Sequence, residues 1–240
     1  MNTKIASTIR DDRSFDEIAG QSSAGLAYRY LRDGLIWRRW TSGEKLKPQH
    51  LTKSCKFTTG ALREALIRLA GEGFVTFEEQ RGFSTLIPDQ KLFYEIRDLR
   101  VLLEGEAASL SISNGGPDWE AKLIAAHHRL SHLEAIMVQE ECVNDFLRAW
   151  SKLDWEFHRA LVSACNSETL IEYYRSAYDK SRLYIVAELA NFGFRGEQTI
   201  AEHKEILDCA LQRDNEACIQ AIIRHVTVKW DSDLIDTQST

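Results

Sequence analysis

The sequence predicts a mainly α-helical protein made of two parts. Apolar residues recur with a helical period over most of the 240 residues. Runs rich in β-forming residues are confined to residues 74–86, and only one proline, Pro117, follows residue 89. The charge is also uneven: residues 1–88 hold 14 Lys+Arg against 10 Asp+Glu, whereas residues 89–240 hold 16 against 26.

The composition argues against membrane-spanning and secreted proteins. No apolar run approaches the ~18 residues that a membrane-spanning helix needs. The N-terminus is polar and carries early acidic residues, unlike a secretory signal. The five cysteines are odd in number and form no C-x-x-C pair, which predicts reduced thiols in a cytoplasm. A slightly basic front joined to an acidic back permits a DNA-facing domain attached to a second domain.

The first 88 residues predict three helices followed by a β-hairpin. Residues 1–22 lack periodicity, so we expect a flexible arm there. Pro48 begins the second helix, in a position that helices tolerate. Thr58 or Thr59 can cap the third helix, which glycines end. The predicted elements are helices over residues 23–40, 48–55 and 58–73 and strands over residues 74–77 and 83–86.

This order of elements is that of a winged helix-turn-helix domain, which we expect over residues 23–88. In that fold one helix presents its N-terminal residues to the major groove of DNA, which is about 12 Å wide. The turn of the hairpin places Arg81 and Gly82 at the tip of the wing. An arginine beside a glycine can enter a narrow minor groove, because glycine lets the backbone come close to its walls.

Residues 89–240 predict an all-α bundle of six helices. The β-rich runs end before this region, and short Gly-, Asn- or Pro-containing stretches separate long segments. These segments are too long and too closely spaced to alternate with strands. The predicted helices span residues 90–113, 118–138, 142–165, 167–191, 196–212 and 214–232.

Four side chains in this region have the spacing of a metal site. His203 and His225 each lie eleven residues from Asp214, so an antiparallel helical hairpin would bring them to the same height, about 16 Å from the turn. Asp154 and His158 are four residues apart and share a helical face. Three imidazoles and one carboxylate suit divalent Zn, Ni, Mn or Fe rather than Ca or Mg, and would leave coordination positions open.

Two other interpretations of the histidines compete with this one. Any single histidine of the set could be a buried residue that only bonds to a neighbour. His128 and His132 also have ligand spacing, with His127 adjacent, but no third ligand lies in a matching place. We therefore expect these three histidines to be solvated or to lie between helices.

Several motifs between residues 26 and 86 carry a family resemblance. They are Ser42-Gly43-Glu44, Thr58, Arg63-Glu64-Ala65-Leu66, Leu69, Glu72-Gly73 and Arg81-Gly82. Together they resemble the DNA-binding domain of GntR-type bacterial regulators. Many relatives have an arginine where this chain has Thr59. Some also have a DNA-contacting arginine where this chain has Gln49. The resemblance implies a DNA-contacting set of Gln49, Thr58, Thr59, Arg63, Arg81 and Gly82.

Residues 89–232 resemble the ligand-binding half of the FadR-like (FCD) branch of that family. The matching pattern is Asp154-x-x-x-His158, then Glu202-His203, then His225. The resemblance implies a divalent metal held by Asp154, His158, His203 and His225, with a small organic acid completing its coordination. It also suggests effector contacts from Arg100 and Asn166. Arg100 could equally pair with Glu104, and Asn166 could equally cap a helix.

We expect a homodimeric transcription factor that acts as a repressor and reads a palindromic operator in the bacterial cytoplasm. Residues 110–130 resemble the corresponding stretch of carbon-starvation-induced regulators, which suggests a short dicarboxylate as effector. One alternative is a metal-dependent enzyme fused to a winged-helix module, since such cages also perform hydrolysis and oxygen chemistry. Another is a scaffold that uses the winged helix for protein contacts.

Overall fold

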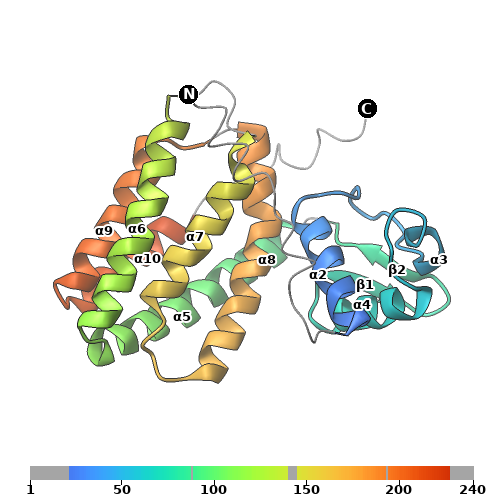
Figure 1. The fold of residues 1–240 in the computed structure, drawn as a ribbon, viewed down its shortest axis with the longest axis horizontal. Helices are drawn as coiled ribbons and strands as arrows, with labels where there is room; N and C mark the ends of the chain where they lie inside the picture. The colour runs from blue at the N-terminus through green and yellow to red at the C-terminus, as the bar shows by residue number, and fades with distance from the viewer. Residues whose placement is uncertain (1–21, 88, 140–144, 193, 228–240) are drawn as a thin grey trace. The chain divides into compact units, whose positions relative to one another are not determined.

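A computed structural model describes residues 22–87, 89–139, 145–192 and 194–227 (Figure 1). The predicted arm over residues 1–22 lies outside the described residues except for Ser22. The chain divides into two compact units: one extends to Asp89 and includes Arg182–Val186, and the other holds the remainder from Gln90 onward. The predicted boundaries place Arg182–Val186 in the second domain, whereas the structure groups these residues with the first unit. Among the described residues, no helix has the length and apolar character needed to cross a membrane.

The first unit contains the predicted elements in the predicted order. Ser22 and Thr58 cap two of its helices, since their hydroxyl oxygens accept hydrogen bonds from the backbone N–H of Gly25 and Ala61 at 3.2 Å. The strands pair antiparallel with Phe77 opposite Phe83. The elements are α2 (Ser23–Ile36), α3 (Pro48–Leu51), α4 (Thr59–Gly71), β1 (Val75–Glu78) and β2 (Gly82–Thr85).

Two helices of this unit are shorter than predicted. Helix α2 ends at Ile36 rather than residue 40, because Arg38 takes a positive φ of 48° and the chain turns so that Trp40 packs on Gly34. Helix α3 ends at Leu51 rather than residue 55. The Ser54 hydroxyl and the next residue's thiol both donate to the Leu51 carbonyl oxygen at 3.0 Å, and turns replace the helix.

The core of the first unit lies between α2 and α4, which pack against each other. Leu31, Leu62 and Leu66 are fully buried there. At the end of α4, Tyr28 donates a 2.5 Å hydrogen bond to Glu72, which also accepts one from Arg68 at 2.9 Å. This hydrogen bond links α2 to the C-terminal end of α4.

The described part of the second unit contains six helices, as predicted. The predicted helix 142–165 is observed over Leu147–Leu161, with Val162 as its C-cap, and Asn166 adopts a left-handed φ of 57° in the connection to α8. Residues 142–144 and 228–232 of two predicted helices lie outside the described residues. The elements are α5 (Gln90–Asn114), α6 (Pro117–Met137), α7 (Leu147–Leu161), α8 (Glu168–Phe192), α9 (Glu197–Leu211) and α10 (Asn215–Val226).

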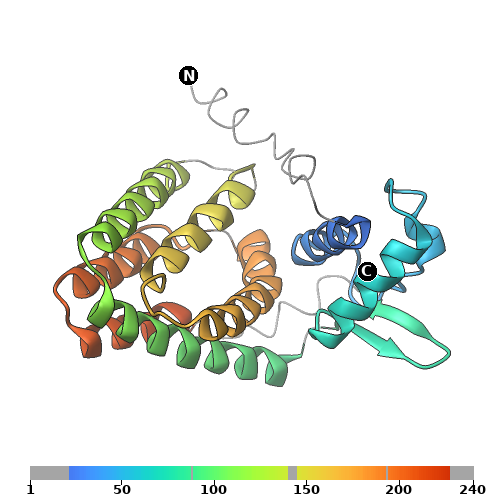
Figure 2. The ribbon, with the colours of Figure 1, turned by 60° about the horizontal axis from the view of Figure 1, so that its bottom comes forward.

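The six helices pack side by side as a bundle (Figures 1 and 2). Helix α9 packs against α6 and α10, and α7 packs against α6. The turn between α9 and α10 is short because Asp214 caps α10, accepting a hydrogen bond from the Ala217 N–H at 3.0 Å. The Trp119 indole N–H donates to the carbonyl oxygens of Ala160 and Leu161, which ties α6 to the end of α7.

Candidate metal centre and DNA interface

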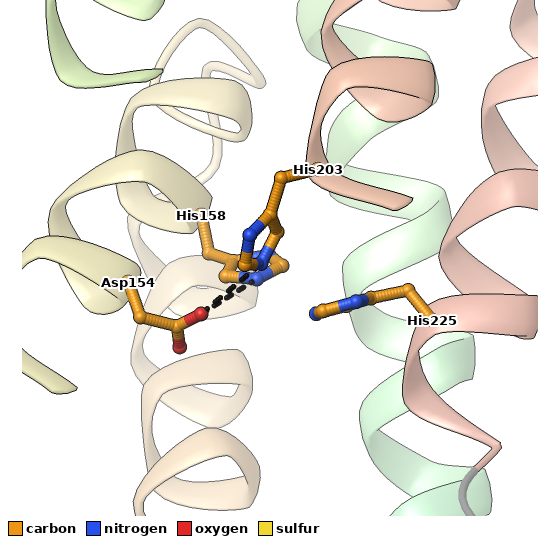
Figure 3. Close-up of side chains that lie close together, drawn as sticks. All are labelled: Asp154, His158, His203 and His225. Atoms are coloured by element: carbon orange, nitrogen blue, oxygen red, sulfur yellow. Dashed lines mark ion pairs between the residues drawn. The ribbon is translucent and has the colours of Figure 1, made fainter. Parts of the chain in front are cut away.

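Four side chains from three helices converge inside the second unit. Asp154 and His158 come from α7, His203 from α9 and His225 from α10, and all four are buried (Figure 3). Their potential ligand atoms lie within 4.8 Å of one another. This is the set that the sequence spacing singles out, and it is a group that could hold a metal ion.

Helix geometry explains how the sequence brings them together. The hairpin of α9 and α10 places the ring centroids of His203 and His225 4.5 Å apart, as their equal distance from Asp214 predicts. One helical turn on α7 places Asp154 Oδ1 3.6 Å from His158 Nε2. The same oxygen lies 3.2 Å from His203 Nε2, which joins the two elements across the bundle.

Each histidine is oriented by a carboxylate outside the cluster. The Nδ1 atoms of the three rings lie 2.5–3.1 Å from carboxylate oxygens. Because a carboxylate accepts hydrogen bonds, a neutral ring keeps its proton on Nδ1 and presents the lone pair of Nε2 to the centre, as is usual for histidine ligands. The pairs are His158 with Glu104, His203 with Glu134 and His225 with Glu202.

The sequence interpretation missed the roles of these three glutamates. Glu134 is fully buried on the face of α6 that also carries Leu130, Leu133 and Met137. An acid in phase with an apolar stripe signals a buried partner, and this signal was present in the sequence. The hydroxyl of Tyr178 donates to Asp154 Oδ2, and no pattern in the sequence points to this contact.

The charges around the cluster leave two acids without a cationic partner of their own. Arg100 pairs with Glu104 at 3.0 Å, and Arg195 pairs with Glu202 at 2.9 Å. Glu134 accepts a hydrogen bond from the Trp150 indole at 3.0 Å but has no arginine or lysine partner among the described residues. With neutral histidines, Asp154 and Glu134 therefore contribute two uncompensated negative charges, which a divalent cation would balance.

Without a cation, protons balance these charges. Burial lowers the pKa of His203, but hydrogen bonds to Asp154 and Glu134 outweigh it and raise that pKa to about 9. Burial also lowers the pKa of His158, but the charges of Glu104 and Asp154 outweigh burial and raise that pKa. Burial and the charge of His203 lower the pKa of His225 to about 3, so this ring stays neutral.

The inner atoms of the cluster fit a metal ion. When the histidines are neutral with the proton on Nδ1, the buried atoms His158 Nε2, His203 Nε2 and Asp154 Oδ1 are all acceptors that face one another, and none of them has a donor. Buried polar atoms without partners are costly, and three that face a common centre are unusual. A single cation would satisfy all three together with His225. The mixed nitrogen and oxygen donors suit a transition metal.

The two suggested effector residues differ in position. Arg100 is only 2% exposed and forms the predicted salt bridge to Glu104, yet its Nη2 atom remains without a partner. Asn166 is exposed, and Ser167 rather than Asn166 caps α8, accepting from the Leu170 N–H at 3.2 Å. The capping interpretation of Asn166 is therefore wrong, and its exposed side chain gives no support to effector binding.

The competing histidines lie apart from the cluster. His128 and His132 are exposed on α6, whereas His127 is half-buried with its ring 5.6 Å from that of Phe157. In the part of the chain that the structure describes, only the Asp154 group gathers three or more metal-binding side chains. The structure thus favours the solvated or interhelical role for these three histidines.

The residues predicted to contact DNA lie on the surface of the first unit. Gln49 is exposed on α3, and Thr58, Thr59 and Arg63 are exposed at the start of α4. No described acidic side chain pairs with Arg63, in contrast to Arg68, which bonds to Glu72. An unpaired arginine near the start of this helix is available to an external partner.

The wing has the geometry that a groove contact needs. Arg81 lies in the turn between β1 and β2, with its side chain 75% exposed and 3.1 Å from Glu78. Gly82 has φ 75°, which glycine adopts without strain. Glu78 would have to release Arg81 for a phosphate or a base, so this arginine is less free than Arg63.

Comparison with known proteins decides the family. The model for "Bacterial regulatory proteins, gntR family" matches residues 24–84, and the model for "FCD domain" matches residues 95–228. The chain belongs to the GntR family, FCD branch. This regulator is 32% identical to the HTH-type transcriptional repressor GlaR of Escherichia coli K12 over 157 residues, which cover 65% of this chain and 70% of GlaR.

Other relatives agree with this assignment. The HTH-type transcriptional regulator BphR of Paraburkholderia xenovorans LB400 is 27% identical over 226 residues, 91% of each chain. The E. coli McbR/YncC structure shares the fold, with a TM-score of 0.70 at 17% identity, covering 86% of this regulator and 94% of McbR/YncC. The regulator is therefore a DNA-binding transcription factor with a helical FCD domain, and the metalloenzyme alternative is not retained.

Proposed function

We propose that the protein is a homodimeric repressor whose affinity for a palindromic operator is set by a small carboxylic acid bound at a divalent metal. The winged helix-turn-helix domain, residues 23–88, reads the DNA. Residues 89–240 hold the metal and the acid and form the dimer. The observation that carries the metal site is the convergence of the buried inner atoms of His158, His203 and Asp154, which have no donor when the histidines are neutral. The DNA site and the protein would share two-fold symmetry.

The metal would be held by Asp154, His158, His203 and His225 and would be zinc, nickel or manganese. When bound, it supplies a positive centre with open positions to which a carboxylate can bind. Asp154 stays ionised, because the charges and hydrogen bonds of His158 and His203 outweigh burial and lower its pKa. The name of the GlaR relative supports repression, and a DNA partner supports a cytoplasmic location.

Two buried donors beside the cluster support the binding of an acid. Arg100 Nη2 and the Tyr174 hydroxyl are fully buried without hydrogen-bond partners. The Arg100 guanidinium lies 4.7 Å from the centroid of the Tyr178 ring, whose hydroxyl bonds to Asp154. An acid with a second carboxylate could accept hydrogen bonds from both donors, which supports a short dicarboxylate.

Titrating the protein with small acids tests the proposal. The Trp155 ring lies 4.6 Å from the Tyr178 ring and 5.9 Å from the Tyr174 ring, so its fluorescence should report acid binding. We expect mono- and dicarboxylates to change this signal and the operator affinity only when zinc, nickel or manganese is present. Operator affinity that no acid changes, or changes equal with and without a chelator, would refute the proposal.

Metal binding should depend on pH. At about pH 6, His158 and His203 are protonated and His225 is neutral, so binding zinc should release about two protons. Because the pKa of His203 is about 9, the apparent zinc affinity should rise as the pH increases toward that value. Calorimetry in buffers of different ionisation enthalpy measures the release, and a pH-independent affinity would contradict the assignment.

A Tyr174→Phe variant should separate acid binding from folding. Removing an unpartnered buried hydroxyl should leave the free protein as stable as the wild type or about 1 kcal/mol more stable. The affinity for a dicarboxylate should fall roughly 5-fold, since one hydrogen bond is lost. Thermal melts and the Trp155 titration measure the two effects, and an unchanged acid affinity would exclude Tyr174 from the binding site.

A further inference from the structure

Helix α4 contains two glycines that its own structure does not require. Neither Gly60 nor Gly71 has a positive φ. A Cβ on Gly60 would meet only Thr58 Oγ1 at 4.0 Å, and one on Gly71 would meet nothing within 4 Å. By contrast, a Cβ on Gly34 would lie 2.5 Å from the Trp40 ring. Packing and backbone geometry therefore leave room for a side chain at residue 60.

The position of Gly60 points to an external reason for its size. It is the second residue of α4, two residues after the cap Thr58, and it is exposed. Glycine is the least favourable helix residue after proline, so a glycine without a packing role weakens the helix. Glycine also allows another molecule to come close to the backbone, and the first turn of this helix is where the domain meets the base edges.

Arg63 lies beside this opening. Residues three apart share a helical face, and helical side chains lean toward the N-terminus, so Arg63 extends over the surface at Gly60. Arg63 is exposed and has no acidic partner among the described residues. Arg68, five residues later, is held by Glu72 at 2.9 Å and lies 4.0 Å from the Tyr28 ring centroid. Of these two arginines, only Arg63 lies beside Gly60.

We propose that Gly60 is a specificity-determining residue of the DNA interface. The missing side chain lets the first turn of α4 approach the base edges and leaves space for the Arg63 guanidinium to bind a guanine through its O6 and N7 atoms. A methyl group at residue 60 would hold the helix away from the groove and displace the guanidinium. The inference depends on the DNA binding of the family and is independent of the metal and the acid.

The test compares two alanine substitutions in full-length protein. The wild type first selects a duplex from a randomised pool, and a shuffled duplex of equal composition serves as the non-specific probe. We expect Gly60→Ala to weaken binding to the selected duplex about 10-fold, as loss of one base-reading pair would. Binding to the shuffled duplex should change less than about 2-fold, and the melting temperature should equal or exceed that of the wild type.

Gly71→Ala is the matched control, because it makes the same change about 16 Å along the same helix. It should leave both affinities unchanged. Arg63→Lys keeps the charge but loses the two-pronged contact, so it should also lose affinity mainly for the selected duplex. Equal affinities of Gly60→Ala and wild type for the selected duplex would overturn the inference. So would equal losses on both duplexes, a lower melting temperature, or a wild type that selects no sequence.

Discussion

A His225→Ala variant is expected to fold like the wild type and to bind zinc at least ~100-fold more weakly, the upper end of the loss seen for outer partners of metal ligands. His225 is the most suitable ligand to remove, because its lowered pKa of about 3 means that it carries no charge in the metal-free protein. Its partner Glu202 keeps the hydrogen bonds from Arg195 and Gln198. Calorimetric titration and circular dichroism measure the two properties.

The control for this variant is His128→Ala, which removes an exposed histidine of α6 outside the cluster. It should leave zinc affinity unchanged. The His225→Ala variant should also lose the response of operator affinity to acids, while its affinity without acid and metal stays that of the wild type. A variant that retains wild-type zinc affinity would show that α10 supplies no ligand.

An Arg100→Met variant is expected to lose about 3–5 kcal/mol of unfolding free energy. The loss follows from leaving Glu104 buried without its arginine, which is the usual cost of breaking one side of a buried ion pair. Both side chains are almost fully buried, with exposed fractions of 2% and 0%. Urea unfolding of the metal-free protein at neutral pH measures the loss.

Arg195→Met is the matched comparison, because Arg195 pairs with Glu202 in a similar way but has an exposed side-chain fraction of 31%. Its loss should stay below about 1 kcal/mol, since exposed ion pairs contribute little. The double variant Arg100→Met/Glu104→Gln should recover part of the stability, because no buried charge is then left without a partner. Similar losses for Arg100→Met and Arg195→Met would contradict the buried-charge explanation.

The inner residues of the candidate site could be predicted from the sequence because helix geometry fixes them. Asp154 and His158 are one turn apart, and the hairpin turn at Asp214 sets the height of His203 and His225. These are local relations, which depend on the 1.5 Å rise and 3.6-residue period. The winged helix-turn-helix domain was predictable for the same reason, since helix caps, turns and apolar periodicity are local signals.

The outer partners were not predicted, because they depend on which helices become neighbours. Glu134 of α6 meets His203 of α9 across 69 residues of sequence, and Glu104 of α5 meets His158 across 54. The periodicity of one helix can show that Glu134 is buried, but it cannot show which side chain of another helix Glu134 contacts. The predicted helix ends also differ from the observed ones where a single residue turns the chain, as Arg38 does with its left-handed backbone after α2.

The central claim is that one divalent cation lies between Asp154, His158, His203 and His225. X-ray data collected from zinc-loaded crystals above and below the zinc absorption edge test it most directly. We expect one anomalous peak per chain within bonding distance, about 2.0–2.2 Å, of the three Nε2 atoms and an Asp154 oxygen. Crystals with zinc bound elsewhere, and the four side chains bridged only by water, would contradict it.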